Sequence, residues 1–219
     1  MNLVLGMDAS WGGLGWALGS DHGPLAAGHV SLSGRSWRWP ALLHYLDHTI
    51  ANEVADAQLL LGAGEAPVRL VIEEPPMIYT PSGPDRRGSQ AAVGYGLGTL
   101  AGGLAMWWCA RPGAPLGYPW FVNPSEWRKW MGIGGKGRIG RKKAAVDSAR
   151  TRGWGKFLAG HAWDEKEGGA VADVAEALLL TVGAARNIAQ APTGPRQITI
   201  SVPRRPPKLP TTTTRKTRP

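Results

Sequence analysis

The alternation of apolar and polar residues in the first part of the chain predicts short β-strands. Three apolar runs separated by Gly-rich turns fit an antiparallel meander, and a later run, VRLVIE, fits a fourth strand. A short run, WFV, predicts a fifth. The predicted strands cover residues 3–8, 14–19, 25–32, 68–73 and 120–122.

Periodic apolar residues predict helices between and after these strands. Residues 40–61 carry Leu, Ile and Val at roughly helical spacing, and the glycines that follow end the helix. Asn123-Pro124-Ser125-Glu126 is a helix start, with Asn as N-cap, Pro at the first position and Glu at the third. The Gly-rich basic stretch at 131–141 predicts a turn. Further helices are predicted at residues 89–110, 142–152 and 169–190.

A meander followed by alternating strands and helices predicts an α/β fold with a mixed five-stranded sheet and helices on both faces. In such a sheet the first and fourth strands can be neighbours. The length of 219 residues suits one domain, predicted here at residues 1–191. From residue 192 the chain is rich in Pro, Thr, Arg and Lys and has no acidic residue, so 192–219 is predicted to be a disordered basic tail.

Four carboxylates occupy positions that suit a metal site. Asp8 and Glu73 each end an apolar strand, and Asp173 and Glu176 share one face of an Ala/Leu helix. Acids in core-forming segments require a compensating cation, and clustered carboxylates suit Mg²⁺, with Mn²⁺ as a substitute. Strand alternation favours Glu73 over its neighbour Glu74. Taken singly, each acid also fits a turn, a solvated strand end or a helix cap.

The charge is positive and uneven, which points to a polyanionic partner. The net charge is +9, and residues 192–219 hold seven of the 25 Lys and Arg residues and none of the 16 acids. Residues 128–156 contain ten Lys or Arg and one acid, Asp147. We therefore expect DNA to bind there, with Lys136 and Arg138 among the contacts. A merely solvated basic surface is the alternative.

Other site classes are disfavoured. The single cysteine, Cys109, excludes an internal disulfide and a Cys-based zinc cluster, and it suits a reducing compartment. The Gly-x-Gly elements around residues 13–15 and 94–98 lack the strand–turn–helix context of nucleotide binding, so no such cofactor is expected. His44 and His48 have helical spacing but lack a nearby third ligand.

A membrane location is also disfavoured. Residues 88–110 carry no charge and have glycines at four-residue spacing, as membrane helices do, but they also contain Gln, Thr and Ser. The N-terminus lacks the pattern of a signal peptide. We expect a cytoplasmic protein, in a bacterium or a phage-infected cell.

Taken in order, these motifs resemble the RuvC family of Holliday-junction resolvases, within the ribonuclease H-like (retroviral integrase) superfamily. The matching elements are LGMDAS…GLGWAL, VIEEPP, WRKWMGIGGKG…RKKAAV and DVAEALLL, which together span residues 3–185. The resemblance implies a ribonuclease H-like sheet flanked by helices. It places four residues at the catalytic, metal-binding positions: Asp8, Glu73, Asp173 and Glu176. The family usually has Asp at the last position, so Glu176 is a departure.

The resemblance also implies partners. Family members are homodimers that pair through a helix, a role that suits residues 89–110. They contact DNA phosphates through basic residues at positions that correspond here to Arg128 and to Lys142 or Lys143. An aromatic wedge that opens the junction corresponds to Pro76, and nearby residues that can substitute are Met77, Ile78 and Tyr79.

Together these features predict a Mg²⁺-dependent endodeoxyribonuclease of recombination and repair. It would resolve four-way (Holliday) DNA junctions by paired symmetrical nicks that leave 5′-phosphates. Two alternatives stay open. One is another ribonuclease H-like nuclease, acting on RNA–DNA hybrids or branched DNA. The other is a non-catalytic basic DNA-binding protein.

Overall fold

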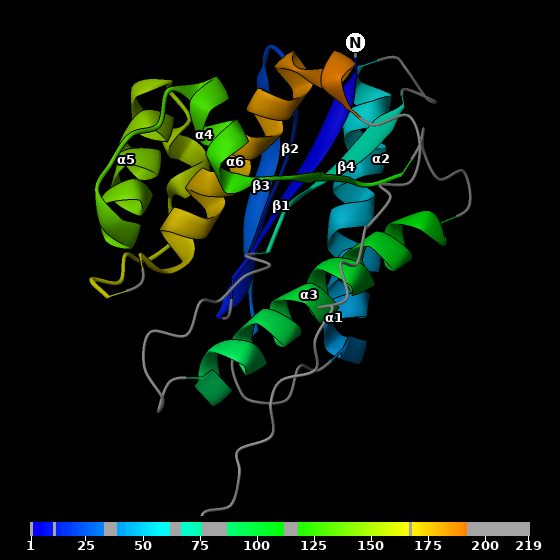
Figure 1. The fold of residues 1–219 in the computed structure, drawn as a ribbon. Coiled ribbons are helices and arrows are strands. Elements are labelled where there is room, and N and C mark those ends of the chain that lie inside the picture. The colour runs from blue at the N-terminus through cyan, green and yellow to red at the C-terminus, as the bar shows by residue number, and fades with distance from the viewer. Residues whose placement is uncertain are drawn as a thin grey trace, which may run out of the picture.

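The computed structural model describes residues 2–10, 12–32, 39–61, 67–75, 87–111, 118–166 and 168–191, and only the backbone of 87–96. All five predicted strands are present. They are β1 (Leu3–Ala9), β2 (Gly13–Ser20), β3 (Gly23–Ser31), β4 (Val68–Glu73) and β5 (Trp120–Val122). They form one sheet of order β3-β2-β1-β4-β5, in which β1 is antiparallel to β2 and parallel to β4. The predicted α/β fold, a mixed five-stranded sheet flanked by helices, is confirmed (Figure 1).

The predicted helices are present, with some differences in extent. They are α1 (Trp39–Tyr45), α2 (Ala51–Leu60), α3 (Arg87–Cys109), α4 (Pro124–Met131), α5 (Gly137–Thr151) and α6 (Gly169–Arg186). The first predicted helix is divided, because a π-helical segment at Leu46–Ile50 joins α1 to α2. The last one stops at Arg186, and 3₁₀ turns occupy Gly155–Leu158 and Ile188–Gln190.

The helices cover both faces of the sheet (Figure 1). Leu3, Leu5 and Met7 of β1 pack in a core with α1, α2 and α3. Val4 of β1 and Val71 of β4 pack in a second core with α4, α5 and α6. Because successive side chains of a strand point to opposite faces, β1 and β4 each contribute to both cores.

The prediction of a turn over 131–141 is wrong for its second half, because α5 begins at Gly137. Gly132 ends α4 in the left-handed conformation, with φ of 67°. Gly135, with φ of 117°, lies so close to Gly140 that a Cβ would overlap the Gly140 carbonyl. The turn is therefore compact, and Gly140 stays inside the helix.

The candidate wedge positions 76–79 and the predicted tail at 192–219 lie outside the described residues. Within the described part of the chain, no helix combines the length and apolar character needed to cross a bilayer.

Candidate active site

Asp8 is directed to the α6 side of the sheet by strand alternation. Val4, which has the same parity, packs in the core that contains α6. Asp8 lies near the end of β1 and is buried, with 5% of its surface exposed. A carboxylate at such a position requires compensation by a nearby cation or by protonation.

Two glycines allow α6 to lie directly against the strands that carry and flank Asp8. A Cβ on Gly6 of β1 would overlap the hydroxyl of Thr181, and a Cβ on Gly15 of β2 would overlap the backbone carbonyl of Asp173. The Thr181 hydroxyl donates to the carbonyl of Ala17 on β2, at 3.1 Å, which ties the helix to the sheet. The small residues of the meander therefore set the position of α6.

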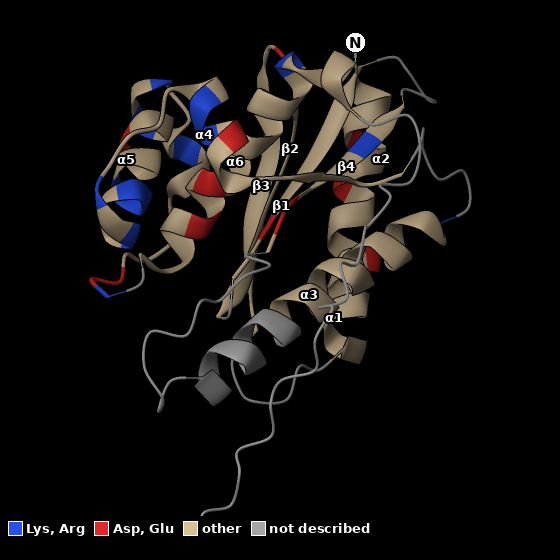
Figure 2. Cartoon of the chain, viewed as in Figure 1, with Lys and Arg blue, Asp and Glu red and all other residues tan. Residues whose placement is uncertain are grey.

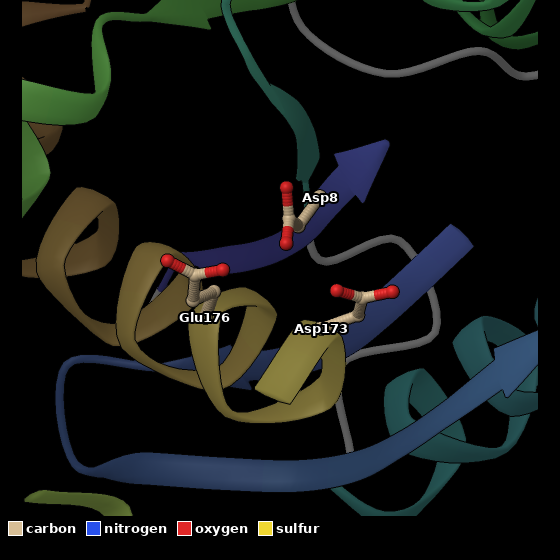
Figure 3. A group of neighbouring side chains, drawn as sticks. All are labelled: Asp8, Asp173 and Glu176. Carbon is tan, nitrogen blue, oxygen red and sulfur yellow. The ribbon is translucent and has the colours of Figure 1, made fainter. Parts of the chain in front are cut away.

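This packing brings three carboxylates together. One oxygen each from Asp8, Asp173 and Glu176 can be chosen so that all three lie within 4.8 Å of one another. Figure 3 shows the side chains of β1 and α6 converging on one region. All three residues are buried. Carboxylate oxygens at this separation are the donor set that Mg²⁺ or Mn²⁺ prefers.

Glu73, at the end of β4, lies beside this group and is held by α4. Its Oε2 accepts a hydrogen bond of 2.7 Å from the indole Nε1 of Trp127, which is fully buried. Nη2 of Arg128 lies 3.9 Å from Oε1 of Glu73 and 3.0 Å from Oε1 of Glu176. The helix start predicted at Asn123 is present and fixes α4, since Asn123 Oδ1 accepts from the Ser125 amide. Two adjacent residues of one helix therefore contact Glu73.

The carboxylates repel one another in the absence of a metal. Burial, followed by the charges of Glu73, Glu176 and Asp173, raises the pKa of Asp8 well above its usual range. Burial and the charge of Glu176 raise the pKa of Glu73 to about 7, although Arg128 and Trp127 act in the opposite direction. Ionising all four groups together is therefore unfavourable without added positive charge.

Two basic side chains offset part of this charge. Nζ of Lys142 lies 2.6 Å from Oδ1 of Asp173 and 3.6 Å from Oε2 of Glu176, and Arg128 pairs with Glu176 and Glu73. Among the described residues these are the Lys and Arg side chains that pair with the four acids. Four ionised carboxylates and two cations leave a net charge of −2, which one divalent metal ion would neutralise. The donor set and its charge thus fit a divalent metal.

The predicted DNA-contacting residues divide into two groups. Arg128 and Lys142 lie within the carboxylate site, and Lys142 is buried, with 7% exposed. Burial would lower the pKa of Lys142, but Asp8, Asp173 and Glu176 outweigh it and raise the pKa. Lys136, Arg138 and Lys143 are exposed on or beside α5. Figure 2 shows Lys and Arg gathered over α4 and α5, next to the acids of α6.

Sequence reasoning missed Ser10 and His29. The Ser10 hydroxyl donates to Oδ2 of Asp173 at 2.9 Å, and Nε2 of His29 lies 3.5 Å from the same oxygen. Burial would raise the pKa of Asp173, but His29, Lys142 and Ser10 outweigh it and hold the pKa below its usual range.

The strand register brings His29 to the site. Gly15 lies opposite Asp8 on one side and opposite His29 on the other, so the three residues form one row across the sheet. Because Gly15 has no side chain, the backbone of Asp173 can lie over the sheet between Asp8 and His29.

Replacing Trp127 with Phe is expected to weaken metal binding about tenfold near neutral pH. The change removes the hydrogen bond to Glu73 and retains an aromatic ring, and a hydrogen bond to a charged group contributes about 1.5–3 kcal/mol. The pKa of Glu73 should rise above about 7 as a result. Titration with Mn²⁺ in a calorimeter measures the change.

Trp130→Phe is the matched control, since this tryptophan lies on the same helix and its ring packs against Trp120, with centroids 5.4 Å apart. Equal Mn²⁺ affinities for the two variants would show that the indole N–H does not support the site.

No family model matches the chain, and no curated protein matches it. Among solved structures, the chain is similar to T. thermophilus RuvC in complex with Holliday junction substrate, with 14% identity and a TM-score of 0.42. The match covers 85% of this chain and 96% of that chain. Because the TM-score is low, the function proposed below depends on the carboxylate site and the sequence motifs.

Proposed function

We propose that this protein is a metal-dependent endonuclease that resolves four-way DNA junctions. The observation that carries the proposal is the cluster of buried Asp8, Asp173 and Glu176 with the partly exposed Glu73 beside it. Arg128 and Lys142 offset only part of its charge. The site lies beside a basic surface on α4 and α5, so phosphate oxygens and the carboxylates can share bound metal ions.

The side chains have distinct tasks in this proposal. Bound Mg²⁺ ions would supply an activated water and stabilise the leaving 3′ oxygen, which yields a 5′-phosphate. Asp8, Asp173 and Glu176 would hold the metal, with Glu73 beside them. Trp127 and Arg128 hold Glu73, while Ser10, His29 and Lys142 hold Asp173. A carboxylate that neighbouring side chains already hold in place reorganises less when it binds a metal ion.

Junction specificity and paired nicks require two active sites, so we propose a homodimer. Helix α3 offers a surface for it: Gly98, Gly102 and Cys109 are exposed on this helix, and Met106 is 75% exposed. A Cβ on Gly98 or Gly102 would meet no atom within 4 Å, so a second helix can approach closely there. The sequence resemblance assigns the dimer contact to the same helix.

A panel of labelled substrates tests this function. Synthetic four-way junction, replication fork, linear duplex and RNA–DNA hybrid are each incubated with the protein, with Mg²⁺ or with EDTA. The proposal predicts Mg²⁺-dependent cutting of the junction in preference to the other three. Preferred cutting of the hybrid or the fork would indicate a different nuclease on this fold. Binding without any cutting would indicate a non-catalytic DNA-binding protein.

Mg²⁺ is expected to raise the unfolding temperature more at about pH 8 than at about pH 6. Because Glu73 has a pKa of about 7 and that of Asp8 is also raised, the metal-free folded protein holds protons near pH 6 that the unfolded chain has released. These groups therefore make the metal-free protein less stable as pH rises through about 7. Protons also compete less with Mg²⁺ at the higher pH, which adds to the difference.

Thermal unfolding followed by circular dichroism, with Mg²⁺ or EDTA at each pH, measures this difference. The variant Glu73→Gln should show a smaller pH dependence of the Mg²⁺ effect. An increase in unfolding temperature that does not vary with pH would contradict the expectation.

A further inference from the structure

A pocket of about 330 Å³ opens beside the carboxylate site, on the β3 side of the sheet. Asp173 forms one wall, so the pocket adjoins the place where a scissile phosphate would lie. Glu73 and α4 are on the opposite side of Asp8, since β4 and β2 flank β1 in the sheet order. A strand crossing the acids from the α4 side would therefore continue into this pocket.

Five of the nine residues that line the pocket carry side-chain hydrogen-bond donors. Arg138 and Lys142 come from α5, Ser10 directly follows β1, and His29 and Ser31 lie on β3. Asp173 is the acid in this lining, and it is already engaged by Ser10, His29 and Lys142. Such a lining selects an anion with several acceptor oxygens.

Two further features favour an anion in this pocket. The first turn of α6 also lines the pocket, and it contains no acidic residue and no side-chain cap. The exposed guanidinium of Arg138 has the planar donor geometry that phosphate oxygens match. Asp173 belongs both to the pocket and to the proposed nuclease site, whose substrate is a phosphodiester chain. Phosphate is therefore the anion expected in the pocket.

We propose that this pocket binds a non-scissile phosphodiester of the DNA strand that is cut, next to the scissile one. The inference rests on the proposed function for its substrate class. Arg138 is the principal contact, and Ser31 adds a hydroxyl donor from β3. Holding the neighbouring phosphate would fix the scissile phosphate over the carboxylates and set the direction in which the strand crosses the sheet.

A methylphosphonate scan tests the pocket. A four-way junction is made with one neutral methylphosphonate at a time along the strand near the branch, and binding is measured with the Asp8→Asn protein so that no cutting occurs. We expect one position to weaken binding about tenfold, equal to about 1.4 kcal/mol. In the Asp8→Asn protein that also carries Arg138→Gln, the same methylphosphonate should have no further effect.

Arg150→Gln is the matched control, because Arg150 is an exposed arginine on the same helix and its loss changes the net charge equally. It should leave sensitivity to the methylphosphonate intact. Ser31→Asp, which adds a negative charge to the pocket from another strand, should reduce that sensitivity. Unfolding temperatures close to that of the parent protein establish that the variants are folded.

If no methylphosphonate position depends on Arg138, the pocket is not a phosphate site. That outcome is separable from failure of the nuclease proposal, because the scan measures binding alone. If the parent protein cuts junctions but no methylphosphonate position depends on Arg138, the nuclease assignment stands and the pocket is not a phosphate site. If one methylphosphonate position depends on Arg138 but the parent protein never cuts DNA, the pocket is still a phosphate-binding site and the nuclease assignment is wrong.

Discussion

Replacing Asp8 with Asn is expected to lower the rate of junction cleavage by at least about 100-fold, the scale of losing a major source of transition-state stabilisation. DNA affinity should stay the same or rise, because the basic surface of α4 and α5 is unchanged and a negative charge is removed. The metal-free protein should also become more stable, since the neutral amide would not be repelled by the other three acids. Single-turnover cleavage, gel-shift binding and thermal unfolding measure the three effects.

The matched control is Asp147→Asn, an identical chemical change at an exposed position on α5. It should leave cleavage within a few-fold of the parent protein. Normal cleavage by the Asp8→Asn protein would remove Asp8 from the active site. An equal loss of cleavage in both variants would show that the effect comes from the change in net charge and not from the site.

Replacing Gly15 with Val is expected to destabilise the protein by about 3 kcal/mol, as overpacking of a core does. Val is a good strand residue, so local propensity alone would predict the opposite sign. The new Cβ would overlap the backbone carbonyl of Asp173, and backbone cannot move aside as a flexible side chain can. Relief would require α6 to shift, which would separate Asp173 and Glu176 from Asp8 and abolish cleavage. Urea unfolding gives the free energy of unfolding.

Gly134→Ala serves as the control, because a Cβ at Gly134 meets no atom within 4 Å. Its free energy of unfolding should stay near that of the parent protein. A stable, active Gly15→Val protein would mean that the close contact between α6 and β2 does not position the acids.

Much of the fold could be predicted from the sequence because its signals are local. Strand alternation favoured Glu73 over Glu74, and Val71, which has the same parity as Glu73, packs in the α6 core. The three-residue spacing placed Asp173 and Glu176 on one helix face. The helix start at Asn123 could also be predicted from the sequence, because its hydrogen bonds join residues that are neighbours along the chain.

The parts that could not be predicted depend on contacts between distant segments. Lys142 was expected to contact DNA phosphate, but packing of α5 against α6 places its ammonium beside Asp173. His29 enters the site through the register of β1, β2 and β3, which the sequence does not specify. The π-helical segment before α2 has no clear sequence signal.

The central claim is tested most directly with a supercoiled plasmid that extrudes a cruciform, which is a four-way junction. Paired nicks across the junction give linear DNA, whereas a single nick relaxes the plasmid, reabsorbs the cruciform and leaves open circles. With Mg²⁺ we predict linear product whose ends are 5′-phosphates and can be ligated, and with EDTA no product. A plasmid that stays supercoiled in Mg²⁺ and in Mn²⁺ would contradict the account, and open circles alone would contradict paired resolution.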